Sequence, residues 1–100
     1  NRNDVIHLLP ERLIYISGAQ NYVEVHYLID GKPQKQLLRT TLSKVTKQVP
    51  ALLRSHRSYL VNPQHFVRWV GTTAALFHTV EVPVSKTYRD DLVQALEKET

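Results

Sequence analysis

The chain has 100 residues, the length of one domain with a single hydrophobic core, and we expect residues 1–100 to form that domain. It contains no cysteine, which excludes disulfides and thiolate zinc sites and fits a reducing compartment such as the cytoplasm. No apolar run approaches the roughly 20 residues that a membrane-spanning helix needs. There is no methionine either, so we expect a domain excised from a longer regulator, with residues 1–4 as a linker end.

The net charge of +4 is unevenly distributed along the chain. Between Gly31 and Val80 there is no aspartate or glutamate, and this stretch holds eight cations: Lys32, Lys35, Arg39, Lys44, Lys47, Arg54, Arg57 and Arg68. Such a stretch gives one side of a domain a positive potential, which attracts nucleic acid or an anionic membrane surface. An ordinary solvated basic surface is the alternative interpretation.

Short apolar or alternating runs predict seven or more strands, at residues 13–16, 23–29, 34–39, 52–54, 59–61, 66–70, 74–78 and 80–84. Gly18 with Asn21 marks a tight connection after the first of them. The second alternates with period two, which predicts a strand with one buried face. Asp30-Gly31 is a hairpin turn signal, and we expect Lys32-Pro33 to lengthen that loop.

Two helices and a short helical turn at Pro63–His65 complete the predicted elements. Thr40 or Thr41 can cap a helix that Pro50 ends, and Ser85 can cap the last helix. Their apolar faces carry Leu42, Val45 and Val49 in the first and Tyr88, Leu92, Ala95 and Leu96 in the second. Because strands and helices do not alternate, we predict a mainly β fold: an elongated antiparallel sheet or sandwich with one short mid-chain helix and a C-terminal helix.

Three segments place polar or charged residues where strands end: IYISGAQNYV at 14–23, SHRSYLVNPQH at 55–65 and VPVSKTYR at 82–89. Their sequence and order resemble the LytTR family, the DNA-binding output domain of many bacterial two-component response regulators, from about Leu13 to Leu96. The resemblance implies that loops at strand ends read double-stranded DNA and regulate transcription. It further implies paired direct repeats in promoters, bound as a dimer through an upstream domain.

Three residues are the leading candidates for DNA contact. The guanidinium of Arg57 can bind a guanine edge or a phosphate through two hydrogen bonds, and no acid lies within twenty residues of it in the sequence. The amide of Asn21 suits an adenine edge or a phosphate, with a plain turn residue as the equal alternative. Lys86 adds charge to a helix N-terminus that can bind phosphate. All three match positions of the family pattern.

Five further candidates flank these residues: Gln20, Lys44, Arg54, His56 and Arg89. Gln20 neighbours Asn21, and His56 and Arg54 neighbour Arg57. His56 is also a candidate for a purely structural hydrogen bond. Lys44 and Arg89 either contact backbone phosphates or lie on a solvated face.

Enzyme and cofactor functions find no support in the sequence. There is no nucleophile-elbow, metalloprotease or phosphate-loop motif, and the five histidines lack metal-ligand spacing, so we expect no catalysis, cofactor or metal. The alternative from another class is a pleckstrin-homology-like module that binds an anionic lipid or a phosphopeptide. That family usually has a tryptophan in its last helix, and Lys86 to Thr100 has none. We therefore expect no membrane contact by this domain.

Overall fold

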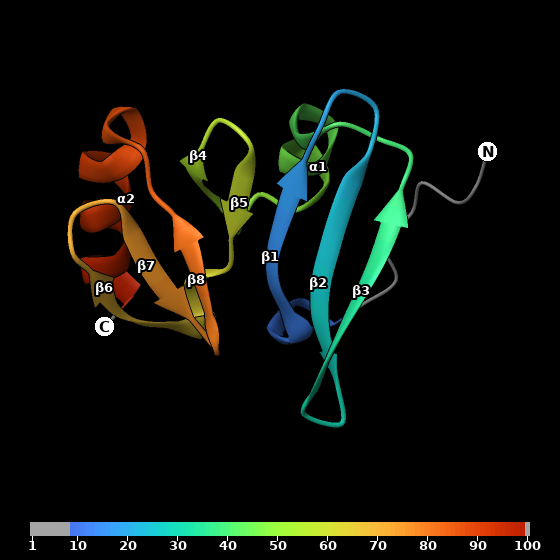
Figure 1. Cartoon of the computed structure of the whole chain (residues 1–100), viewed down its shortest axis with the longest axis horizontal. Helices are drawn as coiled ribbons and strands as arrows, with labels where there is room; N and C mark the ends of the chain where they lie inside the picture. The colour runs from blue at the N-terminus through green and yellow to red at the C-terminus, as the bar shows by residue number, and fades with distance from the viewer. Residues whose placement is uncertain (1–8, 100) are drawn as a thin grey trace.

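The computed structural model describes residues 9–99, so the expected linker end at 1–4 lies outside the described residues. Its strands are β1 (Leu13–Gly18), β2 (Val23–Ile29), β3 (Lys32–Leu38), β4 (Leu53–His56), β5 (Tyr59–Val61), β6 (Phe66–Val70), β7 (Ala74–Phe77) and β8 (Val80–Pro83). The helices are α1 (Leu42–Gln48) and α2 (Lys86–Glu99), with 3₁₀ turns at Pro10–Arg12 and Pro63–His65. The mainly β prediction is confirmed (Figure 1).

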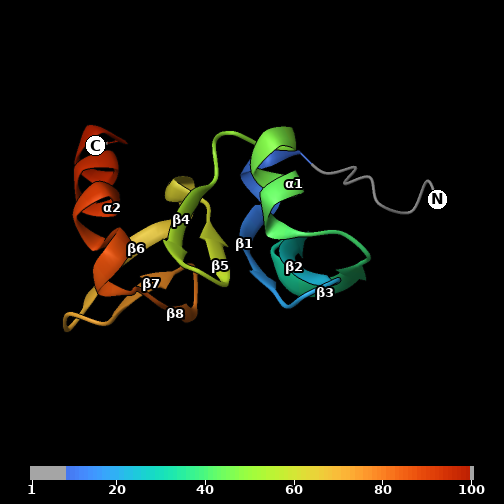
Figure 2. The ribbon, with the colours of Figure 1, turned by 90° about the horizontal axis from the view of Figure 1, so that it is seen from above.

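The strands form two antiparallel sheets. The larger sheet has the order β3-β2-β1-β5-β4, and the smaller one has the order β6-β7-β8. Seen from above, α1 lies beside the larger sheet and α2 lies at the opposite end of the molecule, beside the smaller sheet (Figure 2). The result is elongated, with principal extents of 39 × 30 × 20 Å. Neither helix reaches the length and apolarity needed to cross a membrane within the described residues.

Two apolar clusters hold these layers together. The first packs Leu42 and Val45 of α1 against the larger sheet, and the second packs Leu92 and Leu96 of α2 against both sheets. Neighbouring residues of β5 enter different clusters: Leu60 the first and Val61 the second, both fully buried. Because successive side chains of a strand point to opposite faces, β5 sits at the centre of the fold. The segment that follows Arg57 is thereby fixed in position.

The predictions for the β2–β3 hairpin were partly wrong. Lys32 and Pro33 belong to β3 and pair with Ile29 and Leu28, so they do not lengthen the loop. The turn consists of Asp30 and Gly31 alone, with φ of 52° and 77°, the two positive values that a two-residue hairpin turn of type I′ requires. Ile29 is exposed because the hairpin projects beyond the rest of the sheet (Figure 1).

Of the two predicted helix caps, the one on α1 is confirmed and the one on α2 is wrong. Thr41 caps α1, since its Oγ1 accepts a hydrogen bond of 3.2 Å from the Lys44 amide. Ser85 precedes α2, but its hydroxyl is buried and finds no hydrogen-bond partner among the described residues. The Ser85 carbonyl instead accepts the Tyr88 amide at 3.1 Å. The start of α2 is therefore held through backbone bonds.

Candidate nucleic-acid interface

Three connections lie at one edge of the molecule, the upper edge in Figure 1: the β1–β2 loop, the β4–β5 turn and the start of α2. Backbone hydrogen bonds link them directly. The Gly18 amide donates to the Ser58 carbonyl at 2.8 Å, and the Ser85 amide donates to the Ser55 carbonyl at 2.8 Å. The β4–β5 segment thus joins the other two, and the three segments singled out in the sequence come together.

Most polar residues of the β4–β5 segment hold the backbone. Ser55 is fully buried, and its hydroxyl donates to the Pro83 carbonyl at 3.0 Å. His56 Nδ1 accepts a hydrogen bond of 3.1 Å from the Ser58 amide, and its ring meets the Tyr59 ring edge-on. His56 therefore makes a structural hydrogen bond within the turn. Arg57 stands exposed at the tip of the turn.

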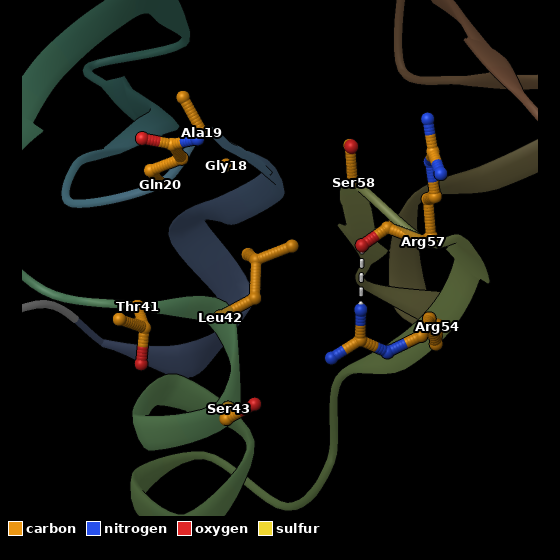
Figure 3. Close-up of a pocket in the computed structure, with 9 residues that line it drawn as sticks. All are labelled: Gly18, Ala19, Gln20, Thr41, Leu42, Ser43, Arg54, Arg57 and Ser58. Atoms are coloured by element: carbon orange, nitrogen blue, oxygen red, sulfur yellow. Dashed lines mark hydrogen bonds between the residues drawn. The ribbon is translucent and has the colours of Figure 1, made fainter.

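Arg54 binds this turn from within. Its Nη1 donates to the Arg57 carbonyl at 2.7 Å, shown as a dashed line in Figure 3. Its Cζ also lies 6.0 Å from the centroid of the Tyr88 ring on α2. In the same view the Arg57 side chain points away from the guanidinium of Arg54 (Figure 3). The two arginines therefore differ in role: Arg54 fixes the turn, and Arg57 is free to reach a partner.

An open pocket of about 540 Å³ separates the β1–β2 loop from the β4–β5 turn. Gln20 and Arg57 stand on opposite sides of it, with Leu42 between them (Figure 3). Gly18 packs closely against Leu42 in the pocket wall, and a Cβ at this position would lie 2.6 Å from Leu42 Cγ. With Arg54 also in its wall and no carboxylate lining it, the pocket is cationic.

A second open pocket, of about 350 Å³, lies between the β1–β2 loop, the connection from β3 to α1, and α1 itself. It brings the predicted residues Asn21 and Lys44 together with Tyr22 and Arg39. Arg39 belongs to the basic stretch without acids but is not among the predicted DNA contacts. The sequence could not show that Arg39 lies near Asn21, because the end of β3 approaches the β1–β2 loop only through strand pairing. Its place in the stretch without acids was the only indication of a role in binding.

The start of α2 carries two cations with different surroundings. Lys86 is exposed at the first helical position. Arg89 Nη1 donates to the Thr72 carbonyl at 3.0 Å, and its Cζ lies 4.5 Å from the centroid of the Trp69 ring. These contacts hold the β6–β7 turn against α2, so Arg89 has a structural role that the sequence did not reveal.

The carboxylate nearest to the β1–β2 loop in sequence is engaged by neighbouring side chains. This carboxylate, of Glu24, contacts His26 at 2.8 Å and Lys35 at 3.7 Å. Burial, followed by the neighbouring Tyr59 and Glu24, raises the pKa of Tyr15 above its ordinary 10.0, so this phenol stays neutral. Among the described residues, Arg39, Lys44, Arg57 and Lys86 have no carboxylate partner. Their charge is available to an anion.

This fold and this cationic edge define a small β-rich domain suited to an anionic macromolecule. Residues 3–97 match the family model described as the LytTr DNA-binding domain. The chain therefore belongs to the LytTR DNA-binding domain family, a family of DNA-binding rather than catalytic domains. The pleckstrin-homology-like alternative finds no support in these comparisons.

A solved structure shows the same fold. It is the LytTr DNA-binding domain of a Bacillus cereus protein that carries the name methyl-accepting/DNA response regulator. The match has a TM-score of 0.72 and 18% sequence identity, and it covers 92% of this chain and 86% of that chain. A search of curated proteins found no match.

Proposed function

We propose that this domain binds double-stranded DNA at a specific sequence and regulates transcription as the output domain of a two-component response regulator. Loops at strand ends read the sequence in this proposal. The observation that carries it is the pair of backbone hydrogen bonds, Gly18 to Ser58 and Ser85 to Ser55, that unites three segments with exposed polar tips at one edge. Reading bases requires side chains that are held in fixed positions relative to one another, and hydrogen bonds between their backbones hold them so.

Each exposed tip has a chemistry that suits DNA. Arg57 presents a free guanidinium, which pairs with a guanine edge or a phosphate. Asn21 and Gln20 are exposed amides at the tip of the β1–β2 loop, suited to an adenine edge. Lys86 and the amides at the start of α2 suit a phosphate. Lys44 adds a phosphate contact, whereas Arg54, His56 and Arg89 support the tips from behind.

The helices are poor readers for a physical reason. The apolar face of α1 is committed to the core through Leu42 and Val45. Beyond its first turn, α2 exposes Asp90 and Asp91 and carries Glu97 further along. A carboxylate near a phosphate is unfavourable by about 1 kcal/mol at the surface, less in salt. Only the start of α2 should therefore approach DNA.

The wider setting is part of the same proposal, and family membership supports it. The domain acts in the bacterial cytoplasm, without membrane contact of its own. It binds direct repeats in promoters as a pair that an upstream domain brings together. Because its longest dimension of 39 Å is close to one turn of DNA, roughly 34–36 Å, a single domain can address neighbouring grooves.

The test is selection of bound duplexes followed by affinity measurements on the selected site and a scrambled one. Arg57→Ala should weaken binding to the selected site by about 1–3 kcal/mol and leave the melting temperature nearly unchanged. The control is Arg68→Ala, which removes the same charge from an exposed residue of β6 and should not change the preference. If about four to eight phosphates are neutralised, log K should fall with log[salt] at a slope of about −4 to −7.

Two results would overturn the proposal. One is equal weakening of selected and scrambled duplexes by Arg57→Ala, which would make Arg57 a general phosphate contact. The other is binding to phosphoinositide liposomes or phosphopeptides in place of duplex DNA.

A further inference from the structure

The second pocket contains a pair of cations whose partner is not part of the domain. Arg39 and Lys44 line it together with Asn21 and Tyr22. Both cations are exposed, and neither has a carboxylate partner among the described residues. In contrast, Lys35 on the preceding strand pairs with Glu24 at 3.7 Å. The two cations therefore keep their full charge for a ligand from outside.

Arg39 is held at this place by its neighbours in the chain. Leu38 and Thr40 on either side of it are buried, and the Thr40 amide donates to the Leu38 carbonyl at 3.1 Å. This tight turn forces the side chain between them outward. The Arg39 Cζ lies 5.9 Å from the centroid of the Tyr22 ring, which is 48% exposed. A cation over an aromatic face loses part of its freedom before any ligand binds.

Lys44 and Asn21 enter the same pocket from other elements. The Thr41 cap begins α1 so that Lys44 stands on its exposed side, while Leu42 and Val45 face the core. Asn21 is exposed in the β1–β2 loop, the predicted reading loop. The pocket thus combines a guanidinium, an ammonium and an amide, three groups that donate hydrogen bonds to phosphate oxygens.

We propose that the Arg39–Lys44 pocket binds one backbone phosphate of the DNA, next to the base that Asn21 contacts. This inference rests on the proposed function and adds to it a contact that fixes the register of the reading loop. A phosphate contact carries no sequence information itself, but it positions the groups that do. Free inorganic phosphate has the same chemistry, and the experiment separates the two sources.

The experiment combines Arg39→Gln with duplexes that carry one methylphosphonate, a neutral linkage, at successive positions of the selected site. For the wild-type protein, neutralising the phosphate that occupies the pocket should weaken binding about tenfold. For Arg39→Gln the same linkage should cost clearly less than in the wild type, because one of the two charged partners is already missing and only Lys44 remains. The salt slope should also become less steep by about one.

Lys47→Gln is the matched control. It removes one positive charge from an exposed position of the same helix but lies outside the pocket. Its methylphosphonate profile should match that of the wild type at every position. Tyr22→Leu provides a second variant that keeps both cations and removes the ring under Arg39; it should lower the penalty at the same phosphate only.

A profile for Arg39→Gln that equals the wild-type profile would overturn the inference. A second outcome would also overturn it. Inorganic phosphate would bind the protein without DNA at submillimolar concentration, as monitored by the NMR signal of the Arg39 side chain, while Arg39→Gln left the methylphosphonate profile unchanged. Failure of the proposed function gives a different result, because the wild-type protein would then bind the selected and the scrambled duplex equally. Thermal melts of the three variants should match the wild type, since Tyr22, Arg39 and Lys47 are all exposed.

Discussion

Arg54→Gln tests whether Arg54 acts on DNA through Arg57. The sequence placed both arginines among the DNA contacts, but the structure commits the Arg54 guanidinium to the Arg57 carbonyl at 2.7 Å. A hydrogen bond from a charged donor contributes about 1.5–3 kcal/mol. Because this one is partly exposed, we take about 1 kcal/mol as its share in fixing the turn. That corresponds to a roughly fivefold loss of preference for the selected site over a scrambled site.

The assay is a double-mutant cycle with Arg54→Gln, Arg57→Ala and the double variant, each measured on both duplexes. The lost charge weakens binding to both duplexes alike, so the ratio of the two affinities isolates the positioning effect. We expect Arg54→Gln to lower this ratio in the wild type and to leave it unchanged once Arg57 is alanine. An equal further loss in the Arg57→Ala background would mean that Arg54 contacts the bases itself.

Two stability predictions concern residues that shape the interface from inside. Asn62→Ala should lower the free energy of unfolding by about 2–4 kcal/mol, because its buried amide donates to the Pro10 and Leu13 carbonyls and accepts from the Gln64 amide. A loss below about 1 kcal/mol in urea titration would refute this account. Gly18→Ala should cost about 1–3 kcal/mol by overpacking against Leu42. A Leu42→Ala background should relieve that penalty, and additive losses would contradict the clash.

Local signals in the sequence predicted the elements well. The dipeptide Asp30-Gly31 correctly predicted the hairpin turn, because these two residue types tolerate the positive φ that the turn needs at both positions. Thr41 correctly predicted the start of α1, because its hydroxyl accepts a hydrogen bond from an amide only three residues away. Lys32 and Pro33 were misplaced because a proline usually weakens a strand. β3 tolerates it as the edge strand of its sheet, a position that only the sheet order reveals.

The roles of the cations could not be predicted, because they depend on contacts between distant segments. Arg89 is held by Trp69 and by Thr72, seventeen residues away in the chain. Arg39 faces Asn21 only because β3 pairs with β2 and returns its end to the β1–β2 loop. Charge counting found the basic stretch but could not separate free cations from those engaged in holding the fold.

The same distinction changes how the segment SHRSYLVN is interpreted. Ser55 and Asn62 are buried and hydrogen-bond to segments outside the turn, and His56 accepts the Ser58 amide within it, so most of its polar residues hold the fold together. Arg57 is the exposed one. A match to this segment therefore indicates that a chain can form the turn and join it to the neighbouring loops. In the proposed function, the DNA sequence that is read depends on the few free tips, which can change without disturbing the hydrogen bonds beneath them.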